Sequence, residues 1–329
     1  MVRLSCRMIL TVVTSAALLT FFLGFFLKTF WNASPMTSLQ PISKDLYKLI
    51  SPSSYRYVLN QLDKCRERSP FLVLMVPVAP GDRASRDVIR KTWGKKDQIT
   101  NIEIIRLFFV GLPTGKDSHR VQMDLESEAL QHADIIQLDF LDSYHNLTIK
   151  TLMMMDWLAS NCRRASYAMK VDADTFLNVH CLVGKLLIHN QSSVKQNYIT
   201  GSVINDGRPR RDRGSRWYIS EEAYPATWFP PYVSGAGYVF SVDLAEKILR
   251  ASKFIPPVPL EDVYVGLCLR ILGIKPTYAF SFTSFHNLFE IRHIQYERCA
   301  YFRRVLVIGF HPADLLQVWP DFQKAKFTC

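Results

Sequence analysis

Beyond residue 69 the sequence alternates short apolar runs with segments of helix length. The apolar runs cover residues 71–78, 104–110, 134–138 and 167–171. Continuous apolar runs of this length are typical of parallel strands that are buried on both faces. A helical pattern at 148–158 separates the last two runs. We therefore expect an α/β body with a largely parallel sheet, flanking helices and a ligand site beyond the carboxyl ends of the strands.

Near the amino end lies an uncharged segment, residues 8–27. At ~1.5 Å per residue it is long enough to cross a hydrocarbon core of ~30 Å. Arg3 and Arg7 precede it, so the positive-inside rule places residues 1–7 in the cytosol and the following chain in a lumen. A cleaved signal peptide is the alternative, but its apolar region is usually shorter, about 7–15 residues. We expect a single-pass type II membrane protein with a signal-anchor.

Residues 28–68 show little sustained apolar pattern, which predicts a stem between the membrane and the body. The stretch 44–62 looks helical and is expected to dock on the body. Residues 69–329 then form the lumenal domain. Its oxidising surroundings permit disulfides, although the spacing of the cysteines leaves their pairing open.

The chain carries 40 Lys and Arg against 29 Asp and Glu, a formal charge of +11. A lumenal domain meets no nucleic acid, so this excess favours acidic small molecules such as nucleotide sugars as partners. Asn146 and Asn190 begin sequons for N-glycosylation. Asn32 begins a third sequon, which lies too close to the expected membrane segment for us to expect its use.

The run at 167–171 leads directly into Asp172-Ala173-Asp174. Carboxylates at positions i and i+2 of an extended backbone project to the same side, so one divalent cation or its bound diphosphate can engage both. A turn or a helix cap is the alternative, because such a pair also occurs by chance in loops. The position at a strand's carboxyl end favours a binding role.

Seven motifs in order give this chain a resemblance to the β1,3-galactosyltransferase family, glycosyltransferase family 31, from about residue 70 onward. They lie at 71–74, 86–94, 134–137, 142–151, 167–174, 232–239 and 261–266. The resemblance implies a GT-A fold, a UDP-sugar donor, Mn²⁺, inversion at the anomeric carbon and a Golgi membrane location. It also implies a disulfide between Cys299 and Cys329.

For the donor, Arg86 and Arg90 are four residues apart on one expected helical face, where guanidinium groups match phosphate oxygens. A solvated helix start is the alternative. Lys150 is expected to face the nucleotide, with packing as its alternative role. By resemblance, Asp172 addresses the ribose or uridine and Asp174 binds the metal.

For catalysis, the resemblance implies that Asp262 is the base that deprotonates the acceptor hydroxyl, while Glu261 orients the acceptor. A helix N-terminus is the other reading of these adjacent carboxylates, and both readings are compatible. The aromatic stretch that holds Trp217 and Tyr232 is expected to line the acceptor cleft, because sugars stack on aromatic rings, although a core role is equally open. Gly235 permits close backbone approach to a ligand.

The resemblance breaks at the last metal ligand. Relatives carry a histidine where this chain has Ile308, and His311 is the candidate replacement. The expected activity is transfer of galactose from UDP-galactose in β1,3 linkage to a terminal GlcNAc or GalNAc on protein or lipid. A β1,3-N-acetylglucosaminyltransferase and a weak lumenal pseudoenzyme that binds nucleotide or glycan are the alternatives. A homo-oligomer is compatible with the sequence.

Overall fold

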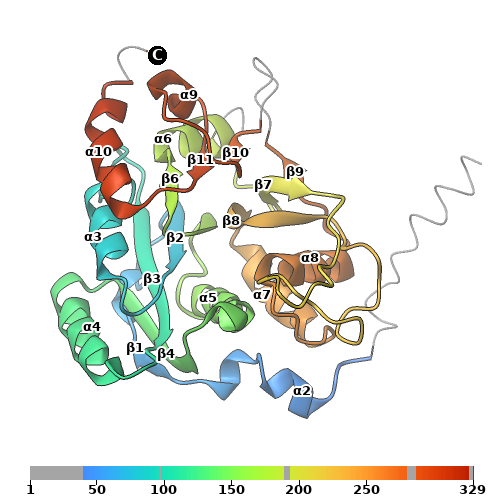
Figure 1. Ribbon diagram of the computed structural model, residues 1–329. Helices are drawn as coiled ribbons and strands as arrows, with labels where there is room; N and C mark the ends of the chain where they lie inside the picture. The colour runs from blue at the N-terminus through green and yellow to red at the C-terminus, as the bar shows by residue number, and fades with distance from the viewer. Residues whose placement is uncertain (1–39, 97, 189–192, 280–286, 326–328) are drawn as a thin grey trace, which may run out of the picture. The chain divides into compact units, whose positions relative to one another are not determined.

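The computed structural model describes most of the chain beyond residue 39 (Figure 1). The described residues are 40–96, 98–188, 193–279, 287–325 and 329. Residues 40–329 group as one compact unit. The expected cytosolic tail at 1–7, the membrane segment at 8–27 and the first part of the stem lie outside the described residues. Within the described ranges, no helix has the length and apolar character needed to cross a membrane.

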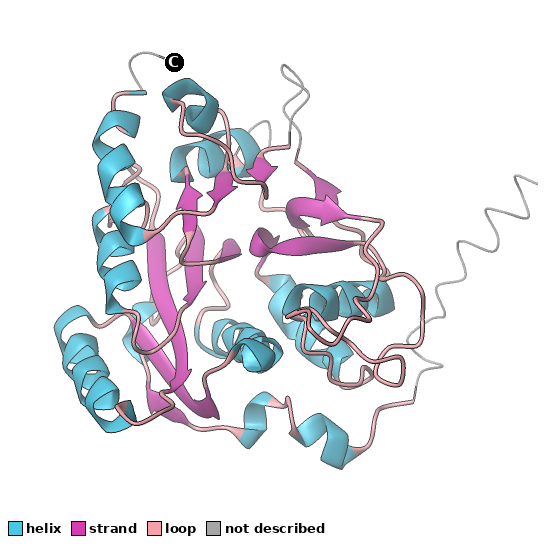
Figure 2. Cartoon of the chain, viewed as in Figure 1, coloured by secondary structure: helices cyan, strands magenta, loops and turns pink. Residues whose placement is uncertain are grey.

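Helices and strands alternate along the first half of the chain, as Figure 2 shows by colour. The strands are β1 (Tyr57–Leu59), β2 (Leu72–Pro77), β3 (Ile104–Leu112), β4 (Ile135–Leu141), β5 (Tyr167–Val171), β6 (Thr175–Leu177), β7 (Ile199–Ile204), β8 (Tyr232–Ser241), β9 (Thr277–Tyr278), β10 (Phe289–Glu290) and β11 (Leu306–Ile308). The α-helices are α2 (Lys44–Lys48), α3 (Arg83–Lys91), α4 (Ser118–His132), α5 (Leu147–Asn161), α6 (Val179–Cys181), α7 (Asp243–Ser252), α8 (Glu261–Leu272), α9 (Arg298–Phe302) and α10 (Pro312–Phe322). Shorter turns are η2 (Pro52–Ser54), η3 (Leu62–Lys64), η4 (Tyr144–Asn146) and the π-helical η5 (Leu182–Leu187).

The large sheet has the strand order β1-β4-β3-β2-β5-β8-β7-β9. Its centre, β4-β3-β2-β5, is parallel, which confirms the four strands expected from the apolar runs. β8 pairs antiparallel with β5, β7 with β8 and β1 with β4. The sheet is therefore mixed, and the expected parallel pairing is found at its centre and between β7 and β9.

Two apolar cores lie on opposite faces of this sheet. Val73 and Met75 of β2 face the core that contains α5, α7 and α8, whereas Leu72, Leu74 and Val76 face the core that contains α3, α4 and α10. Figure 1 shows the two groups of helices on the two sides of the strands. Since both faces are covered, every residue of β2 is buried, which explains the continuous apolar run.

Residues 40–68 belong to the same compact unit as the sheet, so the boundary expected at residue 68 does not separate a stem from the body. β1 extends the sheet through β4, and Ile50 enters a core. Cys65 is bonded to Cys162 at the end of α5. The docking expected for 44–62 is thus present, with α2 as its helical part.

A second sheet has three strands in the order β10-β11-β6. β6 comes directly after β5 in sequence, whereas β10 and β11 belong to the carboxyl-terminal segment. β6 starts one residue after Asp174 and pairs antiparallel with β11. The expected disulfide between Cys299 and Cys329 is present. This small sheet brings residues 306–311 next to the Asp172-Ala173-Asp174 segment.

Candidate active site

Acidic side chains from two distant segments meet beyond the carboxyl end of β5. Asp172 follows β5 directly, and its backbone N–H donates to the Ala236 carbonyl of β8 at 3.0 Å. Glu261 and Asp262 form the first turn of α8. The structure therefore brings together Asp172, Gly235, Glu261 and Asp262, which the sequence analysis had placed in one site.

Lys170 joins these segments from the interior of β5. Its side chain is only 2% exposed, and its Nζ lies 2.6 Å from Asp172 Oδ1 and 2.9 Å from Glu261 Oε1. Nζ also donates to the Gly235 carbonyl. Burial disfavours the charged amine, but the carboxylates of Asp172 and Glu261 outweigh it and raise the pKa of Lys170. Lys170 was not among the site residues predicted from the sequence, although a lone lysine inside an apolar strand is a visible signal.

Asp262 is held by backbone donors. Its Oδ2 accepts from Gly235 N–H at 3.1 Å and its Oδ1 from Val263 N–H at 2.8 Å. The pKa of Asp262 is nevertheless raised, first by burial and then by the Asp172 carboxylate. The side chain is half-buried, so this fixed carboxylate keeps access to a ligand.

Gly235 lies against the acids rather than at an open surface. A Cβ at this position would lie 2.7 Å from Glu261 Oε1 and 3.4 Å from Asp262 Oδ2. The glycine therefore allows β8 to pass close to both carboxylates. The expected close approach exists, but in this structure it is to the acids of α8.

Glu261 has internal partners. The residue is 5% exposed, and its Oε2 accepts from Tyr238 Oη at 3.2 Å and from Thr151 Oγ1 at 3.3 Å, while Oε1 faces Lys170. Burial raises its pKa, against the effect of Lys170. Oε1 is buried without a hydrogen-bond partner among the described residues, and the expectation that Glu261 orients an acceptor stays a prediction. Its role here is to hold α8 to β5 and β8.

Asp172 and Asp174 differ in their surroundings. The Asp172 side chain retains 38% exposure beside Lys170, yet desolvation by the surrounding protein raises its pKa to about 6. Asp174 is exposed, and its carbonyl accepts from Gly309 N–H at 3.1 Å and Phe310 N–H at 2.9 Å. The Asp174 carboxylate is thus presented by a fixed backbone.

The same contacts bring Ile308 close to Asp174, the expected metal ligand. Ile308 is the position where relatives carry a histidine. Ile308 pairs with Thr175 across β11 and β6, next to Asp174. His311 is exposed at the N-cap of α10, two residues beyond Gly309. Among the described residues, no three His, Cys, Asp or Glu side chains are grouped closely enough to hold a metal. The carboxylates of Asp172 and Asp174 do suit a hard divalent cation that is held by one or two carboxylates and substrate phosphates.

The Lys150 side chain is buried in the protein, as in the packing role that was considered for it. Its side chain is 3% exposed, and Nζ lies 2.7 Å from Asp142 Oδ2 and 3.1 Å from the Val78 carbonyl at the end of β2. Burial lowers its pKa, while Asp142 opposes this. The amine ties α5 to the carboxyl ends of β2 and β4, and its expected contact with nucleotide stays a prediction.

Arg86 and Arg90 lie in a buried ion-pair network instead of facing solvent. Arg86 is 1% exposed, its Nη2 lies 2.7 Å from Glu128 Oε2, and its Nη1 donates to the Ala79 carbonyl at 3.0 Å. Arg90 pairs with Asp134 at 2.7 Å and with Glu128 at 2.7 Å. These contacts differ from both readings of the sequence, a phosphate clamp and a solvated helix start. The structure gives both side chains a role in joining α3 to α4 and β4, and their expected contact with donor stays a prediction.

Aromatic side chains stand beside the acids at the surface. Trp217 is 45% exposed and Tyr144 is 41% exposed, and the Arg216 guanidinium lies over both rings, 4.5 Å and 5.7 Å from their centroids. Burial raises the pKa of Tyr144, Arg216 opposes this, and the carboxylates of Asp262 and Asp172 add to the increase. Tyr144 therefore lies within electrostatic reach of the acids.

Tyr232 is only half-buried, at the start of β8. Its ring packs edge-on against Phe229, with 6.1 Å between centroids. Trp217 thus has the exposure that an acceptor cleft needs, whereas Tyr232 combines a core contact with partial exposure. Their contact with an acceptor stays a prediction.

Of the two asparagines expected to carry glycans, the structure describes only Asn146. The Asn146 amide nitrogen, the atom that would carry the glycan, donates to the Leu141 carbonyl at 2.8 Å. Glycosylation at Asn146 would replace this contact, and it stays a prediction. Asn190 lies outside the described residues.

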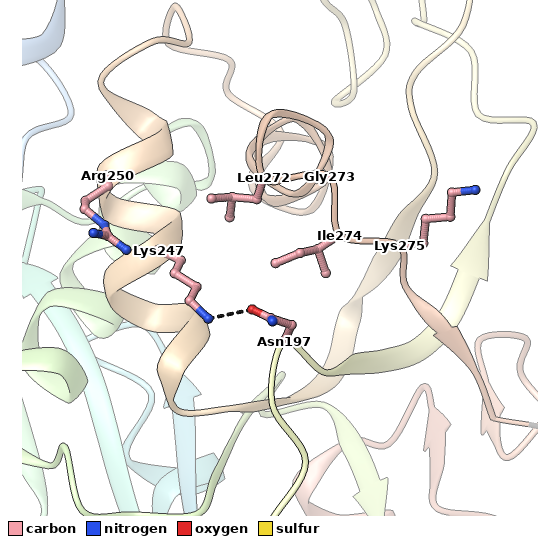
Figure 3. A pocket seen from close by; sticks show the side chains of 7 residues that line it. All are labelled: Asn197, Lys247, Arg250, Leu272, Gly273, Ile274 and Lys275. Carbon is pink, nitrogen blue, oxygen red and sulfur yellow. Dashed lines mark hydrogen bonds between the residues drawn. The ribbon is translucent and has the colours of Figure 1, made fainter. Parts of the chain in front are cut away.

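A cavity with a volume of about 610 Å³ lies elsewhere (Figure 3). It lies between α7 and the end of α8, where Lys247 donates to Asn197 Oδ1 at 2.5 Å. Its lining residues are Asn197, Lys247, Arg250, Leu272, Gly273, Ile274 and Lys275. None of the acids of the candidate site lines it, so size alone does not locate the chemistry.

The fold and the site define an α/β protein whose carboxylates gather beyond the carboxyl end of a central parallel strand, where such sheets bind their ligands. The family model described as galactosyltransferase matches residues 84–279. The chain belongs to this galactosyltransferase family, as the resemblance implied.

Two curated relatives show how far the likeness extends. Beta-1,3-galactosyltransferase 1 of Mus musculus is 38% identical over 332 residues, which covers 98% of each chain. Beta-1,3-galactosyltransferase 2 of Homo sapiens is 40% identical over 279 residues, 84% of this chain and 64% of that protein. The chain thus spans somewhat less than two thirds of the second relative. Both names describe hexosyltransferases.

Among solved structures, the apo structure of the WbbM bifunctional glycosyltransferase matches with a TM-score of 0.35 at 12% identity. The match covers 64% of this chain and 38% of that one.

Proposed function

We propose that this protein is an inverting β1,3-galactosyltransferase with a GT-A fold that uses UDP-galactose as donor. The observation that carries the proposal is the fixed, half-buried carboxylate of Asp262 beside Asp172 and Lys170, at the edge of the sheet where α/β proteins bind ligands. The similarity to two named β1,3-galactosyltransferases supports the reaction and its linkage.

Asp262 acts as the general base in this proposal. An inverting transfer needs a group that takes the proton of the acceptor hydroxyl while the oxygen attacks the anomeric carbon from the face opposite the diphosphate. Bonds from Gly235 and Val263 N–H fix the carboxylate, and burial raises its pKa toward the operating pH, which improves a base. Lys170 holds Glu261, and with it α8, in place, and Glu261 would orient the acceptor.

Asp174 and Asp172 hold the donor end of the site. Asp174 would bind Mn²⁺ together with the donor phosphates, and Asp172 would address the ribose or uridine. When bound, the cation neutralises charge on the departing diphosphate. His311 is the candidate for a further ligand, through its position two residues beyond Gly309.

The acceptor is a glycan on protein or lipid that ends in GlcNAc or GalNAc, and we place its sugar against Trp217 and Tyr144. The expected location is the Golgi membrane, with residues 8–27 as the anchor. A second candidate function follows from Ile308, which puts an apolar side chain where a metal-binding histidine is expected. It is a catalytically weak protein that binds nucleotide or glycan.

The test compares Asp262→Asn with wild type in the full chain, since residues 40–68 pack into the body. Purified protein with intact disulfides receives UDP-galactose and a GlcNAc-terminated acceptor, with Mn²⁺ or with chelator. Loss of a general base costs about 10²–10⁴-fold in rate, so Asp262→Asn should lower turnover by that amount while the melting temperature stays close to wild type. Asp124→Asn, on the exposed face of α4, is the matched control and should retain full activity.

The donor and the metal separate the alternatives. Product from UDP-N-acetylglucosamine but none from UDP-galactose would support the N-acetylglucosaminyltransferase. Binding of UDP without product from any donor would support the weak binding protein. Ile308→His then tests the metal site, because a gain in Mn²⁺ affinity indicates that this position lacks a ligand.

A further inference from the structure

A second cavity lies at the opposite end of the parallel strands from the candidate active site. Its volume is about 270 Å³. It is lined by Lys64, Arg68, Leu74, Gly94, Lys95, Lys96, Glu103, Ile104, Ile105, Arg106 and Asp134. Ile104 begins β3 and Asp134 immediately precedes β4, so the cavity opens at the amino ends of these strands. The acids that we assign to transfer lie beyond carboxyl ends.

The lining carries more positive than negative charge. Five of its side chains are basic and two are acidic. Both acids are occupied, Glu103 by Arg68 at 3.4 Å and Asp134 by Arg90 and Arg106. Within the described part of the chain, Lys64, Lys95 and Lys96 have no carboxylate at ion-pair distance, and the neighbouring Asp97 lies outside it.

Arg106 is one of the basic side chains in the wall of this cavity. Its side chain is 8% exposed, and its terminal nitrogens bond to Asp134 and to the Gly94 carbonyl. Its Nε is buried and has no hydrogen-bond partner in the described residues. A buried donor without an acceptor is unfavourable.

Gly94 makes room for this arginine. A Cβ at Gly94 would lie 2.8 Å from Arg106 Cδ and 2.6 Å from Ile89 Cγ2. The backbone of residue 94 therefore lies close to the side chain, which keeps the guanidinium at the cavity wall. This geometry is built by residues from β3 and from the segment after α3, which are distant in sequence.

The cations also act on one another. The pKa of Lys64 is lowered, first by burial and then by Lys96, with further contributions from Arg106 and Arg68, while Asp134 opposes the shift. A bound anion would remove this repulsion. Because several basic side chains converge on one small cavity, a compact group with two negative charges and several acceptor oxygens suits it.

We propose that this cavity binds a tetrahedral oxyanion, phosphate or sulfate, either as the free ion or as an ester group on a ligand. The lysines supply most of the charge, and Arg106 adds a guanidinium group in the wall. The site is separate from sugar transfer, and its occupation stabilises the junction of β3, β4 and the segment after η3.

The test measures binding of inorganic phosphate and sulfate to the full chain by calorimetry and by thermal unfolding. The variant Lys64→Gln/Lys96→Gln removes two cations without touching the proposed catalytic residues. The matched control, Lys44→Gln/Lys48→Gln, removes the same charge from exposed positions on α2. We expect the site variant to bind at least about tenfold more weakly, since hydrogen bonds to charged groups are stronger than those between neutral groups. The control should bind within about twofold of wild type.

Unfolding without anion provides a second readout that does not depend on affinity. Removing two mutually repelling cations should leave the site variant as stable as wild type, or more stable, in buffer without phosphate or sulfate. Added phosphate should then raise the melting temperature of wild type and the control but not that of the site variant. Galactosyl transfer should be equal in all three proteins.

A sulfated disaccharide and its desulfated form identify the source of the anion. Tighter binding of the sulfated form than of inorganic sulfate supports a glycan ester, and equal binding supports the free ion. The proposal is overturned if wild type binds none of these anions, or if the site variant binds them as well as wild type. Failure of sugar transfer in an otherwise anion-binding protein would contradict only the proposed function.

Discussion

The two buried charge networks of this protein differ in their balance. Around α3, three arginines face two acids, and the arginines hold the pKa values of Glu128 and Asp134 below their usual range against the effect of burial. Around α8, Lys170 faces several carboxylates, and the pKa values of Glu261 and Asp262 are raised by burial. The first network satisfies its acids and joins helices. The second keeps acids in excess, which a structural network avoids and a site that handles protons and cations requires.

Removing the central cation of the site network should have the largest effect. Lys170→Met leaves Asp172 and Glu261 without their buried partner, so the free energy of unfolding should fall by about 3–5 kcal/mol, with loss of turnover. Chemical denaturation and the transfer assay measure the two effects. Lys247→Met, which breaks a partly exposed pair with Asp243, should cost less than about 1 kcal/mol. A stable Lys170→Met protein would contradict the central role of Lys170.

The structural network should be easier to replace. Arg86→Met should cost somewhat less than Lys170→Met, about 3 kcal/mol, because Glu128 retains Arg90 as a partner. Adding Glu128→Leu should restore most of the loss, since apolar side chains can replace a buried ion pair. Denaturation curves of the single and double variants test this. If Lys170→Met/Glu261→Leu recovered activity as well as stability, the two networks would not differ in kind.

Acid should weaken the structural network, whose two buried acids are stabilised in their charged form. Glu128 and Asp134 have pKa values below their ordinary 4.5 and 3.8, so their contribution is complete above those values and is lost as pH falls through the lower folded values. The free energy of unfolding should therefore drop steeply below about pH 4. The Arg86→Met/Glu128→Leu protein should show a shallower drop. Parallel profiles for the two proteins would argue against this assignment.

The smallest effect is expected from a hydroxyl at the border of the site network. Tyr238→Phe removes one bond to Glu261 and should cost about 1 kcal/mol of stability and a small part of the activity. Tyr264→Phe is the matched control, because its hydroxyl bonds to the Ser252 and Ile255 carbonyls away from the site. It should lose similar stability without loss of turnover. Equal activity in both variants would remove Tyr238 from the positioning of Glu261.

The sequence predicts the centre of the sheet well because burial on both faces leaves a local mark. β2, β3, β4 and β5 each follow from a continuous apolar run, and α5 and α8 follow from their helical patterns. The pairing of β8 with β5 and of β1 with β4 joins segments far apart in sequence. Such pairings leave no local pattern, which is why the mixed order of the sheet and the strand pairing of β1 were not predicted.

The candidate site shows the same limit. The positions of Asp172, Gly235, Glu261 and Asp262 near one another agree with the expectation from their motifs. The partners of Arg86 and Arg90 lie about forty residues away, at Glu128 and Asp134. The helical spacing of the two arginines predicts that they share a face, but it does not reveal these partners. Lys170 was visible as a charge within an apolar strand, but its two carboxylate partners come together only in the fold.

The disulfide between Cys65 and Cys162 encloses β2, α3, β3, α4, β4 and α5 in one covalent loop. A chain is made from its amino end, so this loop can close in an oxidising compartment before Asp262, one hundred residues beyond Cys162, has been synthesised. Residues 65–162, which contain the parallel strands β2, β3 and β4, are then linked covalently while the residues that supply Asp262 are still being made. The acidic cluster then assembles when the strands that are synthesised later pair with the edge of the sheet that has already formed.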